Sequence, residues 1–463
     1  MGGGTKQRAV VIGASMAGLS AAAVVASRFG EVVLVDRDPM GDEPADRRGV
    51  PQGRHAHGLL PAGLQCIESW LPGYTDDLVA SGARLADLAH DVLWHQGGGR
   101  RVRYRSGVRG PVASRALLEH HLRRRVLDLP NVTLRTGAGA SGLTATADKR
   151  AITGIALEDG ETLTADLVVD ASGRAGRTVP WLVDLGYPEP ETSHVTVDVR
   201  YASRIFRRDP AQRREWDLGL VFAPPPSGRQ GVFFPLEGDR WLVTLAGFHA
   251  DQPPRHPEGF LAFARTLPSP EVADIIETSE PLGDVATHRM PSSQRRHVER
   301  LRRVPGGLVL LGDAICSFNP VYGQGMSSAT LQAEALGRAL DGAGILDRRF
   351  VRAYNRRAAK AVAPIWQMAT GADFAFPETT GPKPPGTDMV NRYMDRVIAA
   401  THVSEEICQR FMEVTCLLRP SHDLLTPAMA LKVRRALRAA AHGPAAGHCG
   451  DAQAADRDLQ RAA

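Results

Sequence analysis

The stretch over residues 8–36 constrains the fold of this chain more than any other. Residues 9–12 form an apolar run with the length of a buried strand. A turn containing glycine follows, then a segment of small residues over 16–28 that favours a helix, and a second apolar run over 32–35. Two such runs joined by a helix form a right-handed βαβ unit with parallel strands. We therefore expect a parallel sheet covered by helices.

The turn of this unit is typical of a site for dinucleotide phosphates. It reads Gly-Ala-Ser-Met-Ala-Gly over 13–18, with Ser15 where the pattern usually has glycine. The glycines allow a tight turn and close helix packing, and the helix N-terminus attracts phosphate. Asp36 ends the second strand, where an acidic side chain can bind ribose hydroxyls. The alternative is a βα turn without a ligand. The predicted cofactor-binding residues here are Gly13, Ser15, Met16, Ala17, Gly18, Asp36 and Arg37.

A second glycine-rich segment follows the apolar run over 308–311. It begins with Gly312-Asp313, and after Asn319-Pro320 the stretch Gly323-Gln324-Gly325-Met326 opens a helix. Asp313 ends the strand, where it can hold sugar or polyol hydroxyls. The glycines let backbone N–H groups approach a flat ring, and the helix N-terminus stabilises negative charge. A tight turn with a helix cap is the alternative interpretation.

Between the two glycine motifs the pattern changes. Val195, Val197, Val199 and Tyr201 alternate with polar residues, which predicts a half-buried strand. The predicted fold class is α/β (α+β), with a Rossmann-like domain, an inserted mainly antiparallel sheet for the substrate, and C-terminal helices. The predicted boundaries are 1–190 and 291–345 for the nucleotide-binding domain, 191–290 for the sheet domain, 346–441 for the helices and 442–463 for a disordered tail.

Four segments together resemble the single-component FAD-dependent monooxygenases (group A) of the para-hydroxybenzoate-hydroxylase fold. They are the turn 13–18 with Asp36, the loop 48–57, the helix start Ser114-Arg115-Ala116-Leu117-Leu118 and the segment 312–326. Within that group the chain is most similar to the flavin-dependent epoxidases of polyether and polyketide natural-product biosynthesis. The matching segments span most of the chain, and they are specific for the fold and the flavin rather than for the substrate.

The resemblance implies non-covalent FAD and assigns residues to it. Arg115 is expected to reach the FAD phosphates or ribityl chain, and Asp313 the ribityl or ribose hydroxyls. The other implied cofactor-binding residues are Arg48, Gln52, His57, Gly323, Gln324, Gly325 and Met326. No catalytic side chain is certain, because the chemistry is flavin-mediated, and the candidates near the flavin are Asn319, Pro320 and Gln324. The candidates for the substrate pocket, each of which could equally belong to the core, are Val199, Tyr201, Phe222, Phe234 and Phe318.

The activity implied by the resemblance is epoxidation of alkenes in a lipophilic polyketide or isoprenoid precursor by a C4a-hydroperoxyflavin formed with O₂. The electrons are expected from NAD(P)H or from a separate flavin reductase. Two alternatives stay open: hydroxylation of an aromatic or polyketide ring by the same machinery, and reduction of isoprenoid double bonds by a flavin-dependent reductase. A tyrosine or histidine in the pocket near the flavin would favour ring hydroxylation.

Three departures from the family pattern limit what can be transferred. Ser172 replaces the aspartate of the usual Asp-Gly motif, which weakens the expectation of direct NAD(P)H docking. The histidine that usually follows Gly-Asp-Ala-Ala is absent, since the chain continues with Ile315-Cys316. The Trp-x-Trp-x-Ile-Pro segment of flavin halogenases is missing as well, so halogenation is not expected.

Composition excludes several other classes of function. The 463 residues carry a formal net charge of +5, but the arginine clusters are scattered and match no nucleic-acid recognition motif. No apolar run is long enough to span a bilayer, and no signal peptide is recognisable, so a cytoplasmic location without stable membrane insertion is expected. The five cysteines have no metal-binding spacing, and His55 and His57 lack a third ligand, so no metal site is predicted.

Overall fold

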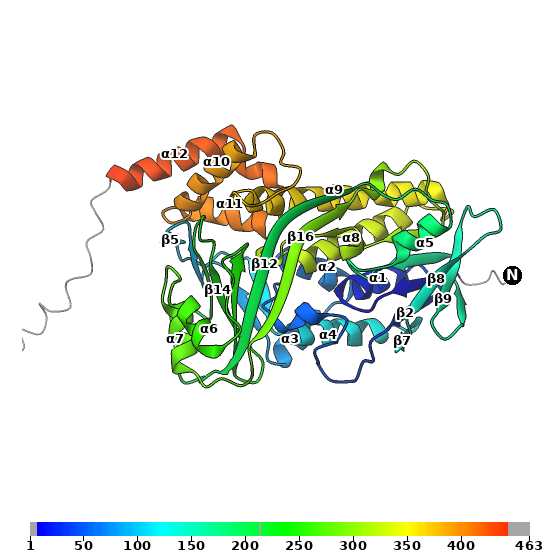
Figure 1. Ribbon diagram of the computed structural model, residues 1–463, viewed down its shortest axis with the longest axis horizontal. Helices are drawn as coiled ribbons and strands as arrows, with labels where there is room; N and C mark the ends of the chain where they lie inside the picture. Colours follow the sequence, from blue (N-terminus) through cyan, green and yellow to red (C-terminus); the bar gives the residue numbers. More distant parts are fainter. Residues whose placement is uncertain (1–6, 213, 443–463) are drawn as a thin grey trace, which may run out of the picture.

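A five-stranded parallel sheet organises one half of the molecule. The computed structural model describes residues 7–212 and 214–442 (Figure 1). The strand order is β17-β11-β1-β2-β7, and every strand except the edge strand β7 is almost wholly buried, as expected for parallel strands covered on both faces. The strands are β1 (Arg8–Ile12), β2 (Glu31–Asp36), β7 (Val132–Thr136), β11 (Leu167–Asp170) and β17 (Leu308–Leu310).

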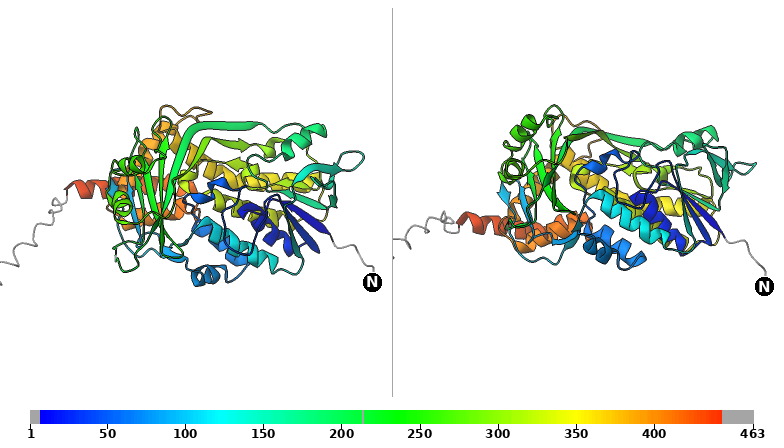
Figure 2. Two further views of the ribbon diagram at one scale, coloured as in Figure 1. Left: turned by 60° about the horizontal axis from the view of Figure 1, so that its bottom comes forward. Right: turned by 90° about the horizontal axis from the view of Figure 1, so that it is seen from below.

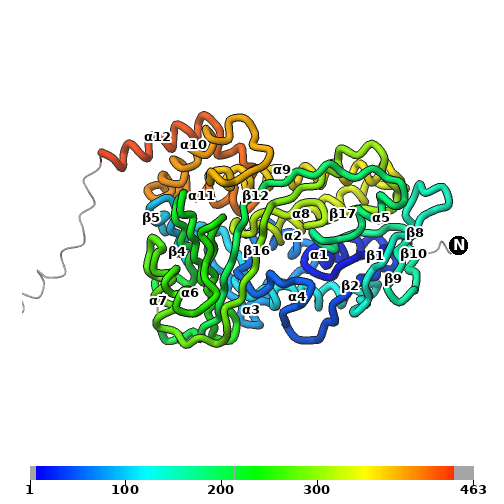
Figure 3. The backbone as a smooth tube through the Cα atoms, viewed as in Figure 1, coloured from blue at the N-terminus to red at the C-terminus, as the bar shows by residue number. Residues whose placement is uncertain are grey.

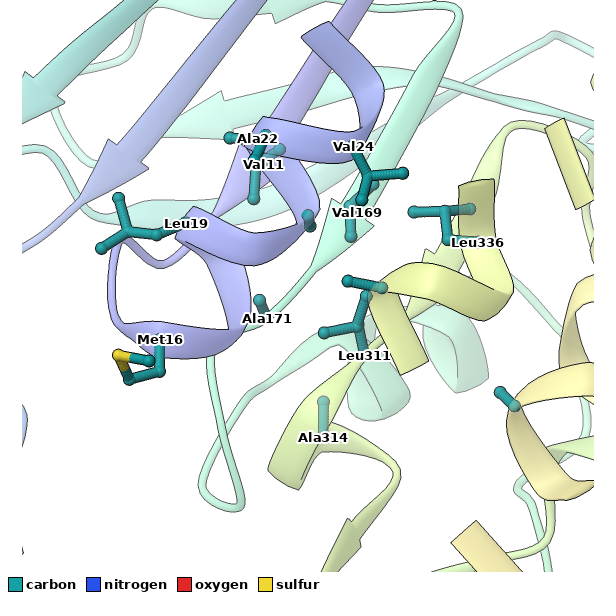
Figure 4. Packing of buried hydrophobic residues seen from close by; sticks show 14 of the residues in the cluster. Val11, Met16, Leu19, Ala22, Val24, Val169, Ala171, Leu311, Ala314 and Leu336 are labelled. Atoms are coloured by element: carbon teal, nitrogen blue, oxygen red, sulfur yellow. The ribbon is translucent and has the colours of Figure 1, made fainter. Parts of the chain in front are cut away.

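Helices α1 (Met16–Ala26) and α8 (Gly325–Leu340) pack together on one face of this sheet. Figure 4 shows Val11 and Val169 of the sheet close to Leu19 and Val24 of α1 and Leu336 of α8. A small antiparallel sheet covers the opposite face, and its apolar side chains join those of β1 and β2. Its strands are β8 (Ala140–Ala145), β9 (Ile152–Leu157) and β10 (Thr162–Thr164).

An eight-stranded mixed sheet forms the other half, in the order β18-β16-β12-β15-β14-β13-β4-β5. Only β13 and β4 pair in parallel. Helices α6 (Pro257–Ala264) and α7 (Glu271–Thr278) cover its outer face. The strands are β4 (Val92–Gln96), β5 (Gly99–Arg100), β12 (Thr192–Arg207), β13 (Leu218–Phe222), β14 (Gln230–Leu236), β15 (Arg240–Phe248), β16 (Ala286–Arg296) and β18 (Cys316–Ser317).

The predicted fold class is confirmed: a Rossmann-like sheet, a largely antiparallel second sheet and C-terminal helices are all present. The second sheet also takes in β4 and β5, which lie within the segment 1–190 that the sequence assigns to the nucleotide-binding domain. Strands β12 and β16 pair over most of their length and run from one half of the molecule to the other (Figures 1 and 3). These two paired strands therefore form a continuous connection between the two halves.

The C-terminal helices begin with α9 (Arg348–Asp373), which packs along α8. The last three are α10 (Thr387–Ala400), α11 (Glu405–Thr415) and α12 (Pro427–His442), which share a small core and lie beside the second sheet (Figure 2). The predicted tail lies outside the described residues from 443 onward. The remaining elements are α2 (Pro61–Trp70), α3 (Tyr74–Ala80), β3 (Arg84–Asp87), β6 (Arg109–Val112), α4 (Arg115–Leu127) and α5 (Thr178–Asp184).

Helix α4 illustrates how local sequence sets an element boundary. Ser114 is its N-cap residue, and the Ser114 hydroxyl accepts a hydrogen bond from the Leu117 N–H at 3.0 Å. The cap makes Arg115 the first residue of the helix, beside the turn after β1. None of the helices in the described part of the chain is long and apolar enough to cross a membrane.

Candidate active site

The turn 13–18 has the backbone geometry that its glycines predict. Gly13 adopts φ +96°, and a Cβ there would lie 2.7 Å from the carbonyl oxygen of Ala171. A Cβ at Gly18 would lie 1.7 Å from the carbonyl oxygen of Gly13. Ser15 is the N-cap residue of α1, but its hydroxyl caps no N–H group of the helix. The first-turn N–H groups of α1 are therefore free to bind a phosphate.

Two arginines and a glutamate surround this turn. The Arg115 Nη2 atom lies 2.9 Å from Ser15 Oγ, and the Arg47 Nη2 atom lies 2.5 Å from the Glu119 carboxylate. Burial lowers the pKa of Arg115, while Glu119 and Asp313 oppose this change. The Nε atoms of Arg47 and Arg115 are buried and have no hydrogen-bond partner among the described residues. Hydrogen bonding around the turn is thus incomplete without a ligand.

Asp36 lies where the motif predicts, but a different arginine accompanies it. The Asp36 carboxylate accepts hydrogen bonds from the Ala14 N–H at 2.7 Å and from Arg47 at 3.2 Å. Arg37 and Arg48, which the sequence analysis singles out, both have exposed side chains. Sequence reasoning missed Arg47 because a loop has no periodicity that assigns the inward direction to one of two adjacent arginines.

The second glycine motif faces the first. A Cβ at Gly312 would lie 2.8 Å from the Cβ of Ala17, so the motif and α1 approach each other closely. The Asp313 side chain is exposed to solvent beside this contact. The surrounding protein raises the pKa of its carboxyl, although the charges of Arg115 and Arg174 act in the opposite direction. Asp313 therefore lies within the electrostatic influence of the arginine that also contacts the first motif.

The N-terminus of α8 offers an open backbone surface. A Cβ at Gly323 or Gly325 would meet no atom within 4 Å, and no side chain caps the helix. The side chains of Met16 and Met326 are buried in the core, so only their backbones can serve a ligand. Gln324 is also buried, and its Nε2 atom donates to the Thr415 carbonyl of α11 at 3.3 Å.

A short 3-10 helix, η4 (Pro320–Tyr322), precedes this surface and is anchored from behind. Asn319 is fully buried, and its Nδ2 atom donates to Asp373 Oδ1 at 2.7 Å. The Tyr322 hydroxyl donates to the same oxygen at 2.9 Å, while Pro320 is exposed. Sequence reasoning missed Asp373, since the end of a long helix carries no motif that relates it to Asn319.

The second sheet presents a row of cross-strand neighbours toward η4. The Tyr201 hydroxyl donates to Asn319 Oδ1 at 3.3 Å. Residues paired across antiparallel strands lie on the same face of a sheet, so strand register assigns the rest of the row. The row consists of Phe222, Gln230, Ala246, Tyr201 and His288.

The predicted pocket residues separate into two groups. Tyr201 and Phe222 belong to this row. Phe234 is half-buried against a neighbouring cluster around β4. Val199 is buried beside the stacked rings of Phe248 and Phe376, and Phe318 is buried in the core of the nucleotide-binding half. Val199 lies two residues before Tyr201 on β12, so the two side chains share one face, as the alternating pattern predicts, whereas Phe318 lies off the sheet.

The loop after β2 docks onto the same face through His55. His55 Nδ1 lies 2.7 Å from Ser203 Oγ, and the His55 ring lies 5.8 Å from the ring of Tyr201. Burial lowers the pKa of His55 to about 4. His57 Nδ1 donates to the His55 carbonyl at 2.9 Å. Burial, followed by the charge of Arg115, lowers the pKa of His57 to about 3, so both rings are neutral near pH 7.

Ser172 turns back toward its own strand. Its backbone N–H donates to Asp170 Oδ1 at 2.9 Å, and its hydroxyl donates to the same oxygen. Burial raises the pKa of Asp170, although the bonds from Ser172 oppose this change. The aspartate of the family pattern is therefore replaced here by Ser172, whose hydroxyl is hydrogen-bonded to the buried Asp170 carboxyl. No group of three or more His, Cys, Asp or Glu side chains in the described ranges could hold a metal ion.

These features fit FAD. The uncapped N-terminus of α1 with Arg115 suits the pyrophosphate, and Asp36 and Asp313 suit hydroxyl groups of the ribose and ribityl chain. The open space over Gly323 and Gly325 suits a flat ring. The two motifs lie next to each other, as a single extended cofactor requires.

Comparisons with known proteins agree with this geometry. The family described as FAD binding domain matches residues 6–363. Protein Rv3254 of Mycobacterium tuberculosis (strain ATCC 25618 / H37Rv) is 32% identical over 431 residues, which cover 90% of each chain. Kynurenine 3-monooxygenase of Salinispora tropica is 26% identical over 358 residues, which cover 70% of each chain.

Solved structures show the same fold. The Pseudomonas aeruginosa protein PqsL, in complex with 2-aminobenzoylacetate, superposes with a TM-score of 0.56 at 20% identity, covering 79% of this chain and 94% of that one. FAD is the cofactor, with NAD(P)H and O₂ as the co-substrates of the group. The chain belongs to the FAD binding domain family, and it is an FAD-dependent monooxygenase, an oxidoreductase that uses O₂.

Proposed function

We propose that this monooxygenase hydroxylates an aromatic ring that carries a hydroxyl or amino group. The observation that carries the proposal is the position of Tyr201. Its hydroxyl donates a hydrogen bond to Asn319, in the segment that leads to the glycine stretch 323–326. His55 lies beside Tyr201 on the same face. Phenol and imidazole groups at a flavin suit a ring with a polar substituent better than a plain alkene.

Hydrogen-bond directions on this face support an acceptor role toward the substrate. The Tyr201 proton is donated to Asn319 Oδ1, which leaves lone pairs on the Tyr201 oxygen. Burial holds the pKa of Tyr201 well above its ordinary value, so the side chain stays a phenol. His57 uses its Nδ1 proton for the His55 carbonyl, so in the neutral ring Nε2 is an acceptor. Such acceptors orient a ring O–H or N–H group.

When bound, FAD supplies the electrons that activate O₂. The chain's own contribution is binding, orientation and exclusion of water. The half-buried ring of Phe222 lies in the same row as Tyr201 and can hold an aromatic ring by its face. The sheet on one side and the segment Asn319–Tyr322 on the other limit the orientations open to a substrate.

The names of relatives support the same substrate class. The PqsL structure contains 2-aminobenzoylacetate, an aromatic amine by its name, and one curated relative is a kynurenine 3-monooxygenase. A second candidate is the epoxidation of an alkene in a lipophilic polyketide or isoprenoid precursor. The half-buried apolar side chains of Phe222 and Val232 on the sheet face favour it, because an apolar surface suits a hydrocarbon.

The test is oxygenation of two matched compound sets by the FAD-loaded enzyme, with electrons supplied by NAD(P)H or by an added flavin reductase. Phenols and anilines form one set, and isolated alkenes of similar size form the other. The proposal expects O₂ uptake coupled to products that have gained one oxygen atom in the aromatic set, and loss of coupling in Tyr201→Phe. Oxygen addition to the alkenes alone would replace it with epoxidation.

The source of electrons is tested in the same preparation. NADPH and NADH are each added to the oxidised enzyme without oxygen, and bleaching of the flavin is recorded. Direct reduction would show that Ser172 permits docking of the nicotinamide cofactor. Reduction by dithionite alone would instead favour a separate flavin reductase.

A further inference from the structure

Asp373 is a buried carboxyl at the end of α9 that the proposed oxygenation does not use. The residue has no exposed surface, and its Oδ2 atom has no hydrogen-bond partner among the described residues. Its other oxygen accepts two hydrogen bonds, from Asn319 at 2.7 Å and from Tyr322 at 2.9 Å. Buried carboxyls are usually paired or fully hydrogen-bonded, so an orphaned oxygen here requires an explanation.

Both donors belong to the segment that leads to the flavin. Asn319 precedes η4 and Tyr322 is its last residue, and Gly323 with its neighbours directly follows as the open surface at α8. Asn319 also accepts the hydroxyl proton of Tyr201 from the second sheet. Asp373 thus connects α9 with the segment Asn319–Tyr322 and, through Asn319, with the sheet face that bears Tyr201.

We propose that Asp373 is a positioning residue whose charge state sets how firmly the turn Asn319–Tyr322 is held against the flavin. As a carboxylate, it strengthens both hydrogen bonds, since bonds to a charged acceptor are stronger than bonds to a neutral one. As a neutral acid, it keeps the two donors on Oδ1 and carries its proton on the unpartnered Oδ2. The turn Asn319–Tyr322 is therefore held more firmly when Asp373 is ionised and less firmly when it is neutral.

The surroundings allow this change of state near neutral pH. Burial raises the pKa of Asp373 to about 7, and the bonds from Asn319 and Tyr322 act in the opposite direction. The titratable groups that face it are Tyr322 from η4 and Tyr201 from β12, and burial keeps both phenols protonated. No cation contributes to the pKa of Asp373.

His249 is a further ionisable side chain that is connected to Asp373, through Thr379. Its Nε2 atom lies 3.3 Å from Thr379 Oγ1, and Thr379 donates to the backbone carbonyl of Asp373 at 2.8 Å. It reaches Asp373 only through Thr379. A variant at His249 therefore tests whether a pH-dependent change originates from His249 or from Asp373.

The experiment measures the visible absorption and fluorescence of bound, oxidised FAD in the full-length enzyme between pH 5 and pH 9. Free FAD in the same buffers is the reference. We expect one transition with a midpoint near pH 7 in the wild type and in His249→Gln. Asp373→Asn should lose the transition and resemble the low-pH wild type at every pH, because its amide is neutral and keeps an acceptor oxygen.

Two further variants keep the test decisive. Tyr322→Phe removes one donor to the carboxylate, which should move the midpoint to higher pH because the ionised form loses a hydrogen bond. This variant decides the question if Asp373→Asn does not fold. Asp388→Asn changes an exposed acid that pairs with Lys383, and it should leave the transition unchanged. A wild-type spectrum without a transition, or a transition that survives in Asp373→Asn, would overturn the proposal.

The outcome is independent of the proposed substrate. The spectra require only bound FAD, so failure of ring hydroxylation leaves them unaffected. Conversely, a spectrum that does not change with pH would remove the role of Asp373 and leave the assignment of the substrate class intact.

Discussion

At the scale of single residues, we propose Arg115 as the side chain that contacts the cofactor phosphates. It starts α4, contacts Ser15 and lies within the influence of both Glu119 and Asp313. A hydrogen bond to a charged group contributes about 1.5–3 kcal/mol. We therefore expect Arg115→Ala to weaken FAD binding about 10- to 100-fold, as measured by fluorescence titration of the apoprotein.

The matched control for this change is Arg124→Ala. Arg124 lies on the same helix but is exposed and remote from the turn. It should leave the dissociation constant of FAD unchanged. Equal effects of the two substitutions would mean that overall charge, rather than the contact with the phosphate turn, governs binding.

At the scale of elements, the β1–α1 turn depends on Gly13. A side chain there must adopt φ +96° and also approaches the carbonyl oxygen of Ala171 in the neighbouring strand's turn. The left-handed backbone alone costs a residue other than glycine about 1–2 kcal/mol. Gly13→Ala should lower the free energy of unfolding by more than this amount, as measured by urea denaturation.

Gly186→Ala provides the comparison for the backbone contribution. Gly186 has φ +88°, but a Cβ there would meet no atom within 4 Å. It should therefore show only the backbone cost. If Gly13→Ala were no more destabilising than Gly186→Ala, the close approach of the turn to β11 would not matter for stability.

At the scale of the whole molecule, the loop that bears His55 and His57 joins the two halves. Their pKa values of about 4 and about 3 lie below the value of a free imidazole. As the pH falls from neutral, the unfolded chain binds protons before these rings do, so the folded state loses stability. Stability should therefore fall as the pH drops from about 7 toward 4.

His57→Gln should make this decline shallower, because one of the two groups that are protonated mainly in the unfolded chain is removed. The measurement is the urea midpoint of wild type and variant at several pH values in that range. His422→Gln, which changes an exposed ring, should keep the slope of the wild type. An unchanged slope in His57→Gln would count against a buried neutral ring at position 57.

Local sequence determined the elements that hold the cofactor. The βαβ unit, the glycine turn, the Ser114 cap and the position of Asp313 shortly after a strand all follow from residue types acting over a few positions. Steric limits on φ, strand burial and helix capping are short-range effects, so a single sequence contains them. The family, the cofactor and the fold class could therefore be predicted.

Only the tertiary structure decided which side chains meet across the chain. His55 bonds Ser203, 148 residues away, and Asn319 bonds Asp373, 54 residues away. Arg47 rather than Arg48 faces Asp36, and Phe318 packs in the core of the nucleotide-binding half instead of lining the sheet. Such contacts depend on how whole elements pack, and no periodicity or motif within one segment encodes them. That is why the sequence predicts the cofactor, while the three-dimensional arrangement places Tyr201 beside His55 and links it through Asn319 to Asp373.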